Sequence, residues 1–202
     1  SHILILLLIK FLDADILPLS LLKTYHKICN INSGNLFNGQ EAIMDHTRVF
    51  IHGLESTSQG TKGLYFREHF PGMIIHDYEG PLEKRMAKLE KDLSGLSNLI
   101  IVGSSFGGLM GAIYGCTFPD KVNRLVLLAP ALNLPEFRPF LSKPAAMPVF
   151  VYHGTSDDVV PPLEVKEICT KVFSNLSHHL VEDDHSLHLT FPEMNWNDLL
   201  SV

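Results

Sequence analysis

The stretch "LIIVGSSFGGLMG", residues 99–111, decides the fold because it changes character in its middle. Its first four residues are large and apolar and predict a buried strand, whereas the residues after Ser105 are typical of a helix. Between them lies Gly103-Ser104-Ser105-Phe106-Gly107, a match to G-x-S-x-G, the pattern of a sharp turn from strand to helix. The flanking glycines let strand and helix come close, so we expect the turn to present Ser105 at the surface of a site.

The same glycines raise two phosphate-binding alternatives, and the spacing argues against both. A P-loop requires G-K-[ST] after its last glycine, but Leu109-Met110 follows Gly107-Gly108. The dinucleotide fingerprint requires G-x-G-x-x-G, and this spacing is absent. G-x-S-x-G also occurs by chance in structural turns, so its meaning depends on the rest of the chain.

Short apolar runs recur from residue 48 onward, each bounded by Gly, Pro or Asp. Their apolarity is continuous, which is typical of strands in a parallel sheet covered on both faces. The runs are "RVFIHG", "GMIIHD", "LIIVGS", "RLVLLAP" and "PVFVYHG", and Leu180-Val181 is a candidate last strand.

Helical patterns lie between these runs. In residues 81–95 the apolar positions recur every three or four residues, and the charged Lys84, Arg85, Lys88 and Glu90 are expected to face outward. Further helices are expected after Ser105 and after Pro161-Pro162. Strand and helix in alternation predict an open α/β sheet with right-handed crossovers.

A serine needs a base to become a nucleophile, and the base needs a carboxylate to orient it. In this architecture the chain order is serine, acid, histidine. Asp157 and Asp158 follow the run "VFVYHG", and His185 lies in "VEDDHSLHLTF" further on. Both gaps have room for strand-plus-helix units between loops at one sheet edge. The Phe106 N–H would point toward an oxyanion beside Ser105.

With these residues the chain resembles the α/β-hydrolase superfamily, and within it the small esterases of the YqiA/YcfP type. The resemblance covers roughly residues 46–200 and rests on "FIHGLES", "VGSSFGG", and "HGTSDDVVP" followed by "DDHSL". It implies a three-layer fold with a mostly parallel sheet, nucleophile Ser105, acid Asp157 and base His185. It also implies that Leu54 supplies the second oxyanion N–H beside Phe106.

Other histidines have simpler interpretations. His52 and His153 each precede a glycine at a strand end, and we expect them to hold loops by hydrogen bonds. His188 is a rival to His185, but the Asp-Asp pair before His185 fits the resemblance better. The nearby His and Asp cluster lacks H-E-x-x-H spacing and cysteine support, so we expect no metal and no cofactor.

Composition and length limit the partners and the compartment. Sixteen Lys and Arg against 22 Asp and Glu give a net charge of −6, which disfavours nucleic acid. Three scattered cysteines suggest a reducing compartment, so we expect a cytoplasmic protein. The apolar run at residues 3–9 is too short for a membrane span. We divide the chain into an N-terminal extension, residues 1–44, and a hydrolase domain, residues 45–202.

The sequence therefore predicts a serine hydrolase that cleaves short acyl esters or thioesters through an acyl-enzyme. The segment from Pro130 to Ala146 is too short for a separate lid, so we expect an open, shallow site. The alternative is a non-catalytic binding protein with the same fold. The physiological substrate and the oligomeric state do not follow from the sequence.

Overall fold

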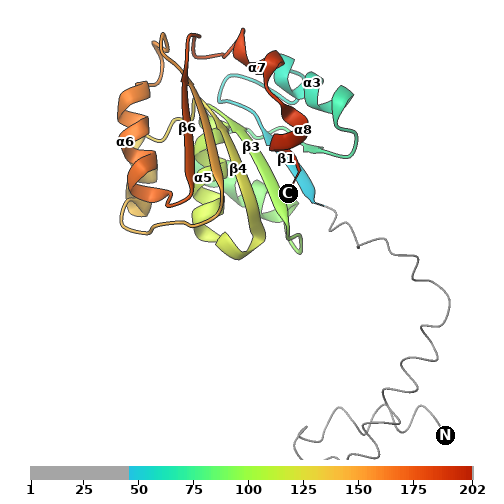
Figure 1. Cartoon of the computed structure of the whole chain (residues 1–202). Helices are drawn as coiled ribbons and strands as arrows, with labels where there is room; N and C mark the ends of the chain where they lie inside the picture. Colours follow the sequence, from blue (N-terminus) through green and yellow to red (C-terminus); the bar gives the residue numbers. More distant parts are fainter. Residues whose placement is uncertain (1–45, 202) are drawn as a thin grey trace, which may run out of the picture. The chain divides into compact units, whose positions relative to one another are not determined.

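A six-stranded, all-parallel sheet organises the molecule (Figure 1). The computed structural model describes residues 46–201. In these residues the strand order is β2-β1-β3-β4-β5-β6. The strands are β1 (Thr47–Ile51), β2 (Ile74–Ile75), β3 (Leu99–Ser104), β4 (Val122–Leu128), β5 (Val149–Gly154) and β6 (Leu176–Val181).

Helices connect the strands and cover the sheet. The α-helices are α3 (Thr61–His69), α4 (Leu82–Asp92), α5 (Phe106–Thr117), α6 (Pro162–Val172), α7 (Thr190–Glu193) and α8 (Trp196–Leu199). Residues 46–201 also contain two short 3₁₀ helices, η3 (Pro119–Lys121) and η4 (Pro135–Phe140). The predicted N-terminal extension lies outside the described residues, and the boundary near residue 45 stays a prediction.

The strands bury alternate residues in two separate cores, because successive side chains point to opposite faces of a sheet. On one face Ile101 packs in the cluster that includes Leu89 of α4, Leu109 of α5 and Val165 of α6. On the other face Val102 and its neighbours pack with a second cluster, which contains Phe66 of α3, Phe191 of α7 and Trp196 of α8. The continuous apolar runs therefore arise from burial on both sides, and the predicted three-layer α/β fold is confirmed.

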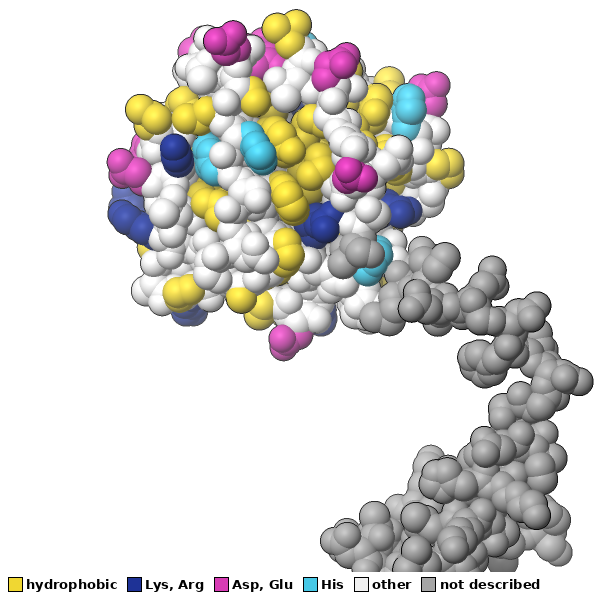
Figure 2. Space-filling view, in the orientation of Figure 1, with side chains coloured by type: hydrophobic (Ala, Val, Ile, Leu, Met, Phe, Trp, Pro, Cys, Tyr) yellow, Lys and Arg dark blue, Asp and Glu magenta, His cyan; other side chains and the backbone are white. Residues whose placement is uncertain are grey.

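The second face is only partly covered by helices. The outer strands β5 and β6 leave Phe150 and Tyr152 half-buried there and His179 exposed. The Tyr152 and His179 rings stack at 4.6 Å between centroids. Figure 2 shows histidine side chains among hydrophobic ones over β6.

The two ends of the sheet differ most from expectation. β2 is only two residues long, and β6 begins four residues before the predicted Leu180-Val181. The sequence pattern did not predict the first half of β6 because it contains the polar residues Ser177, His178 and His179. An edge strand can carry polar residues that a central strand cannot.

Helix α3 was not predicted either. Its Gly63 packs directly on the carbonyl of Ser58, where any Cβ would clash.

One residue of α4 is placed opposite to its prediction. Arg85 was expected to face outward with the other charged residues, but it is only 5% exposed. Its guanidinium turns inward because backbone carbonyls and an aromatic ring at the sheet edge solvate it, as described below. A charge on an amphipathic helix can therefore be buried where polar backbone faces it.

The strand order creates the site. From β1 the chain crosses to β2 on one side, and from β2 it crosses back to β3 on the other side of β1. Such a reversal leaves a crevice outside the carboxyl ends of β1 and β3, where ligands bind in open α/β sheets. Between β4 and β5 the only regular element is η4, so the described chain has no separate lid there, as predicted.

Candidate active site

Ser105 lies on the sharp turn between β3 and α5. Its φ of 54° and ψ of −117° are unfavourable for a residue with a side chain, and neighbouring backbone holds it in place. The Ser105 N–H donates to the Leu128 carbonyl (2.8 Å), and its own carbonyl accepts from Gly108 (2.9 Å) and Ala131 (3.1 Å). The strain is thus offset by hydrogen bonds to the end of β4, and the hydroxyl is directed into the crevice.

Glycines at two positions allow this turn. A Cβ on Gly103 would collide with the backbone of Gly107 and Gly108 in the first turn of α5. A Cβ on Gly107 would collide with the carbonyls of Ile51 and His52 at the end of β1. The G-x-S-x-G pattern is therefore required by backbone approaching backbone, as predicted from the sequence.

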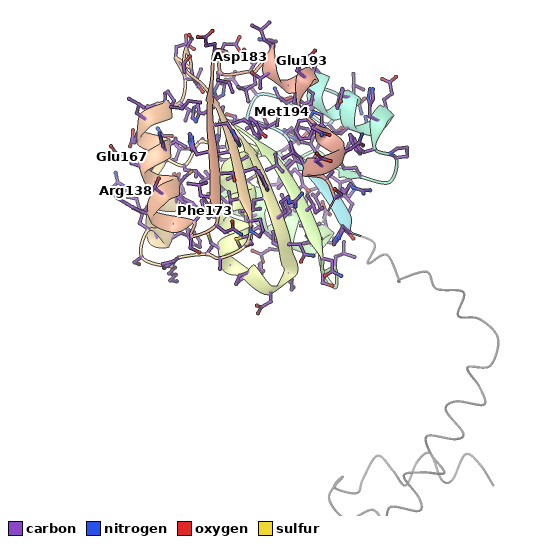
Figure 3. All side chains as sticks on the ribbon, viewed as in Figure 1. Arg138, Glu167, Phe173, Asp183, Glu193 and Met194 are labelled. Carbon is purple, nitrogen blue, oxygen red and sulfur yellow. The ribbon has the colours of Figure 1, made fainter. Side chains whose placement is uncertain are left out.

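The loop after β6 carries His185, and Asp183 shapes it. Asp183 lies at the carboxyl end of β6 (Figure 3) and is 7% exposed. Its Oδ2 accepts from the N–H groups of Leu189 (3.0 Å) and Thr190 (2.7 Å), and its Oδ1 accepts from Asp184 (2.8 Å). Burial alone would raise the pKa of Asp183, but these hydrogen bonds lower it below its ordinary value. The Asp183 carboxylate therefore holds the backbone both before and after His185 in place.

A second set of contacts fixes the same loop from outside. Oδ1 of Asp184 accepts from the Ser186 N–H (2.8 Å), and Nζ of Lys62, on α3, donates to the Ser186 carbonyl (2.6 Å). The Lys62 ammonium also lies 5.4 Å from the centroid of the Phe191 ring. Sequence reasoning did not assign a role to Lys62, because nothing near α3 signals a contact with residue 186.

The three residues predicted to form a triad lie in one hydrogen-bonded chain. Nε2 of His185 is 3.0 Å from Oγ of Ser105, and Nδ1 of His185 is 2.8 Å from Oδ2 of Asp157. A carboxylate only accepts, so Nδ1 of His185 carries the proton and Nε2 is free to accept from the serine hydroxyl. This is the arrangement in which an imidazole can take a proton from serine.

Asp157 is held as a carboxylate in a fully buried position. Its Oδ1 accepts from the backbone N–H groups of Val159 (2.9 Å) and Val160 (2.8 Å). Burial alone would raise the pKa of Asp157, but hydrogen bonds from Val160, His185 and Val159 outweigh it and lower the pKa. The neighbouring Asp158 has an exposed side chain. Of the two adjacent aspartates, the geometry thus joins Asp157 to His185.

Two backbone N–H groups are available to an oxyanion beside Ser105. Phe106 begins α5, where the first N–H groups have no intrahelical partner. The Gly53 backbone lies against the Ser105 side chain, which brings the Gly53–Leu54 peptide into the crevice. Within residues 46–201, neither the Leu54 N–H nor the Phe106 N–H has a protein acceptor.

His52 orients the Gly53–Leu54 peptide. Its Nδ1 donates to the Gly53 carbonyl (2.7 Å), and its Nε2 accepts from the Tyr78 N–H (3.0 Å). Carbonyl and N–H of one trans peptide point in opposite directions, so fixing the Gly53 oxygen also fixes the Leu54 N–H. Both ring nitrogens of His52 are used in this way, which agrees with the expected structural role.

Arg85 supports both candidate oxyanion residues from below. Its guanidinium donates to the carbonyls of Gly80 (2.7 Å) and Leu54 (3.3 Å) and lies 5.3 Å from the centroid of the Phe106 ring. It forms no ion pair with a described carboxylate, and its Nη1 is buried without a described partner. Burying a guanidinium with an unpartnered nitrogen destabilises the fold, so we infer that Arg85 has a role beyond packing.

The remaining histidine predictions can be placed as well. His188 pairs with Asp184 (2.7 Å), is largely exposed, and has no hydrogen bond to Ser105. His153 is buried and contacts Asp157, which is taken up below. No group of three or more His, Cys, Asp or Glu side chains in residues 46–201 could hold a metal ion.

A pocket of about 730 Å³ opens at Ser105 and His185. This volume lies within the range of small-molecule sites. The site is therefore deeper than we expected from the absence of a lid in the sequence. Its walls come from the loops after β1, β4, β5 and β6 and from α3 and α7, and they include the apolar residues Leu54, Tyr65, Phe106, Leu134, Val159 and Phe191.

Comparisons with known proteins agree with the fold. The family model of the alpha/beta hydrolase fold matches residues 53–144. No curated protein sequence matches the chain. Alpha/beta hydrolase domain-containing protein 10 from mouse is 20% identical with a TM-score of 0.62, over 82% of this chain and 93% of that chain.

Two further solved structures are similar in fold. Est1E from Butyrivibrio proteoclasticus with bound ferulic acid is 16% identical with a TM-score of 0.63, over 77% of this chain and 86% of that chain. A monoacylglycerol lipase from Paleococcus ferrophilus is 15% identical with a TM-score of 0.57, over 76% of this chain and 93% of that chain.

The chain has the α/β-hydrolase fold, and the family model of that fold matches residues 53–144. The narrower resemblance to YqiA/YcfP-type esterases stays a prediction. No helix in residues 46–201 is long and apolar enough to span a bilayer.

Proposed function

We propose that the protein is a serine hydrolase that cleaves carboxylic esters, with short acyl esters or thioesters as its substrates. The observation that carries the proposal is the hydrogen-bonded chain from Ser105 through His185 to Asp157. It lies at the switch point of the sheet and at the mouth of a pocket. A serine, a neutral imidazole and a buried carboxylate in this order are the parts that acyl transfer requires.

In the first half of the reaction, Oγ of Ser105 attacks the acyl carbonyl carbon while Nε2 of His185 takes the hydroxyl proton. The carbonyl oxygen becomes an oxyanion, which the N–H groups of Leu54 and Phe106 stabilise. Asp157 keeps Nδ1 of His185 protonated and stabilises the imidazolium that forms. The tetrahedral intermediate then collapses, and His185 gives the proton to the leaving alcohol or thiol.

In the second half, water replaces the alcohol. His185 removes a proton from the water, which attacks the acyl-enzyme carbonyl within the same oxyanion site. Collapse releases the carboxylic acid and returns the proton to Ser105. No group other than those of the described site is needed to balance these steps.

The comparisons support an ester substrate at a coarse level. The similar structures include Est1E with bound ferulic acid and a protein named as a monoacylglycerol lipase, although identities of 15–16% reach no further than the fold. The apolar pocket wall suits an acyl chain, and the lack of a lid over it limits the chain length that it can shield from water. We therefore place short acyl groups first.

The main alternative is a binding protein that has kept the fold without the reaction. Reaction with a fluorophosphonate probe separates the two, because only an activated serine forms the phosphonyl adduct. The native protein should be labelled on Ser105 and should hydrolyse p-nitrophenyl butyrate.

Two variants control this experiment. S105A should show neither labelling nor hydrolysis while keeping its circular dichroism spectrum. S104A, one residue earlier in the same turn, should keep both activities. A native protein that folds but neither labels nor turns over would exclude the proposed function.

A further inference from the structure

A second histidine contacts the carboxylate of the proposed triad. His153 lies on β5, and its side chain is completely buried. Its Nε2 is 2.9 Å from Oδ2 of Asp157, the same oxygen that receives Nδ1 of His185 at 2.8 Å. The Asp157 carboxylate thus lies between two imidazole rings.

The protonation of His153 follows from its partners. Besides the carboxylate, its Nε2 lies 3.1 Å from the carbonyl oxygen of Val160. Both neighbours can only accept hydrogen bonds, so Nε2 carries the proton and donates. Nδ1 of His153 is buried without a described partner, as fits a neutral ring with its proton on Nε2.

We propose that His153 is a positioning residue that fixes the Asp157 carboxylate and keeps His185 at the basicity that the reaction needs. This inference rests on the proposed function, because it assigns His153 to the same Ser105, His185 and Asp157 relay. His153 does not reach the reacting atoms, and it acts only through Asp157.

The electrostatic argument concerns the shared oxygen. A donor on Oδ2 draws negative charge away from the side of Asp157 that faces His185. The imidazolium of His185 is then stabilised less than by a carboxylate with no second donor. A general base works best when its pKa lies close to the working pH.

The surroundings of His153 keep it a neutral donor. The titratable groups that face it are Asp157 on the loop after β5, His185 on the loop after β6, and His178 on the neighbouring strand β6. Burial lowers the pKa of His153, and the charge of Asp157 opposes this only in part. His153 therefore donates without titrating while His185 gains and loses its proton.

A purely structural role explains the residue poorly. The buried Nδ1 has no hydrogen-bond partner, which lowers the free energy of unfolding. A leucine of similar volume at this position would avoid that loss. If packing alone mattered, His153→Leu would leave the active site unchanged. The hydrogen bond to Asp157 is what leucine cannot supply.

The first test is an NMR titration of the histidine rings, which does not depend on turnover. In the native protein His153 should stay a neutral ring with its proton on Nε2 across the pH range in which His185 titrates. His153→Leu should raise the pKa of His185 by about 0.5 to 1 unit. His153→Gln, whose amide nitrogen can occupy the Nε2 position, should return it toward the native value.

Kinetics give the second test. His153→Leu should lower kcat on the order of 10-fold with little change in KM, and should move the acidic limb of the kcat/KM profile to higher pH. His153→Gln should recover most of kcat. The matched control is His178→Leu. His178 is a half-buried histidine on the neighbouring strand with no hydrogen bond to Asp157, so its substitution should leave kcat and the acidic limb of the kcat/KM profile unchanged.

Three results would overturn the inference. The first is a His153 ring with its proton on Nδ1 in the native protein, and the second is a pKa of His185 that does not change in the His153→Leu variant. The third is an equal kinetic effect of His153→Leu and His178→Leu. The first uses only native protein, so the inference stays testable if His153→Leu does not fold. Failure of the proposed function is distinct, because it would appear as a native protein that neither labels nor turns over.

Discussion

Nδ1 of His185 lies 2.8 Å from Oδ2 of Asp157, whereas the side chain of Asp158 is exposed to solvent. Adjacent carboxylates in one loop therefore have different surroundings. Only Asp157 can keep the His185 ring in the tautomer that accepts a proton from Ser105.

Asp157→Asn should therefore lower kcat by on the order of 10⁴-fold, because the amide favours the wrong tautomer and removes the charge that stabilises the imidazolium. Asp158→Asn is the matched control and should keep nearly native kinetics. Ester hydrolysis by both variants, with circular dichroism to verify folding, decides between them. Greater damage from Asp158→Asn would show that the acid is assigned to the wrong residue.

Arg85 should influence the rate through the Leu54 and Phe106 backbone. Arg85→Met removes the donors to the Gly80 and Leu54 carbonyls, so we expect kcat to fall about 10-fold, equivalent to about 1.4 kcal/mol of transition-state stabilisation. Arg124→Met is the control, because Arg124 also donates to backbone carbonyls but at the C-terminal end of the chain. Equal kinetic effects in steady-state assays would argue against a special role for Arg85.

The sequence predicted the central part of the fold well. Residues 99–107 combine a buried strand with glycines that backbone contact requires, so both the strand and the turn follow from local chemistry. The order of Ser105, Asp157 and His185 along the chain placed them at one sheet edge. Their hydrogen bonds come from the structure, and their roles remain predictions.

Other features depend on long-range contacts that no local pattern encodes. Arg85 looked like a solvent-exposed helix charge, and its burial depends on the loop after β1 and on the Phe106 ring. Lys62 acts across 124 residues of sequence, and it belongs to no motif that predicts its partner. Such residues become recognisable only once the elements are in place.

The pocket should select acyl chains by length. Each methylene that finds apolar wall contributes ~0.8 kcal/mol, and carbons beyond the lidless rim contribute little. Values of kcat/KM for p-nitrophenyl esters should therefore peak at short chains and fall toward palmitate. Val159→Ser, on the pocket wall and well exposed, should reduce the preference for butyrate over acetate. A maximum at palmitate would contradict the predicted short-chain preference.

His178 should make the fold sensitive to acid. Neither ring nitrogen of His178 has a described partner, and burial is the main cause that lowers its pKa to about 4. An unfolded chain binds a proton at this residue below about pH 6.5, but the folded protein does not until about pH 4. The free energy of unfolding should therefore fall as pH decreases through this window.

His178→Leu should remove that part of the pH dependence. We expect the variant to gain ~1–2 kcal/mol in stability relative to the native protein at pH 5, and distinctly less at pH 7.5, since the native ring is neutral in both states there. Urea unfolding at the two pH values measures the difference. His179→Leu is the control, because the side chain of the next residue points to the opposite, exposed face of β6. An equal gain at both pH values would mean that the substitution improves packing and that the titration of His178 contributes nothing.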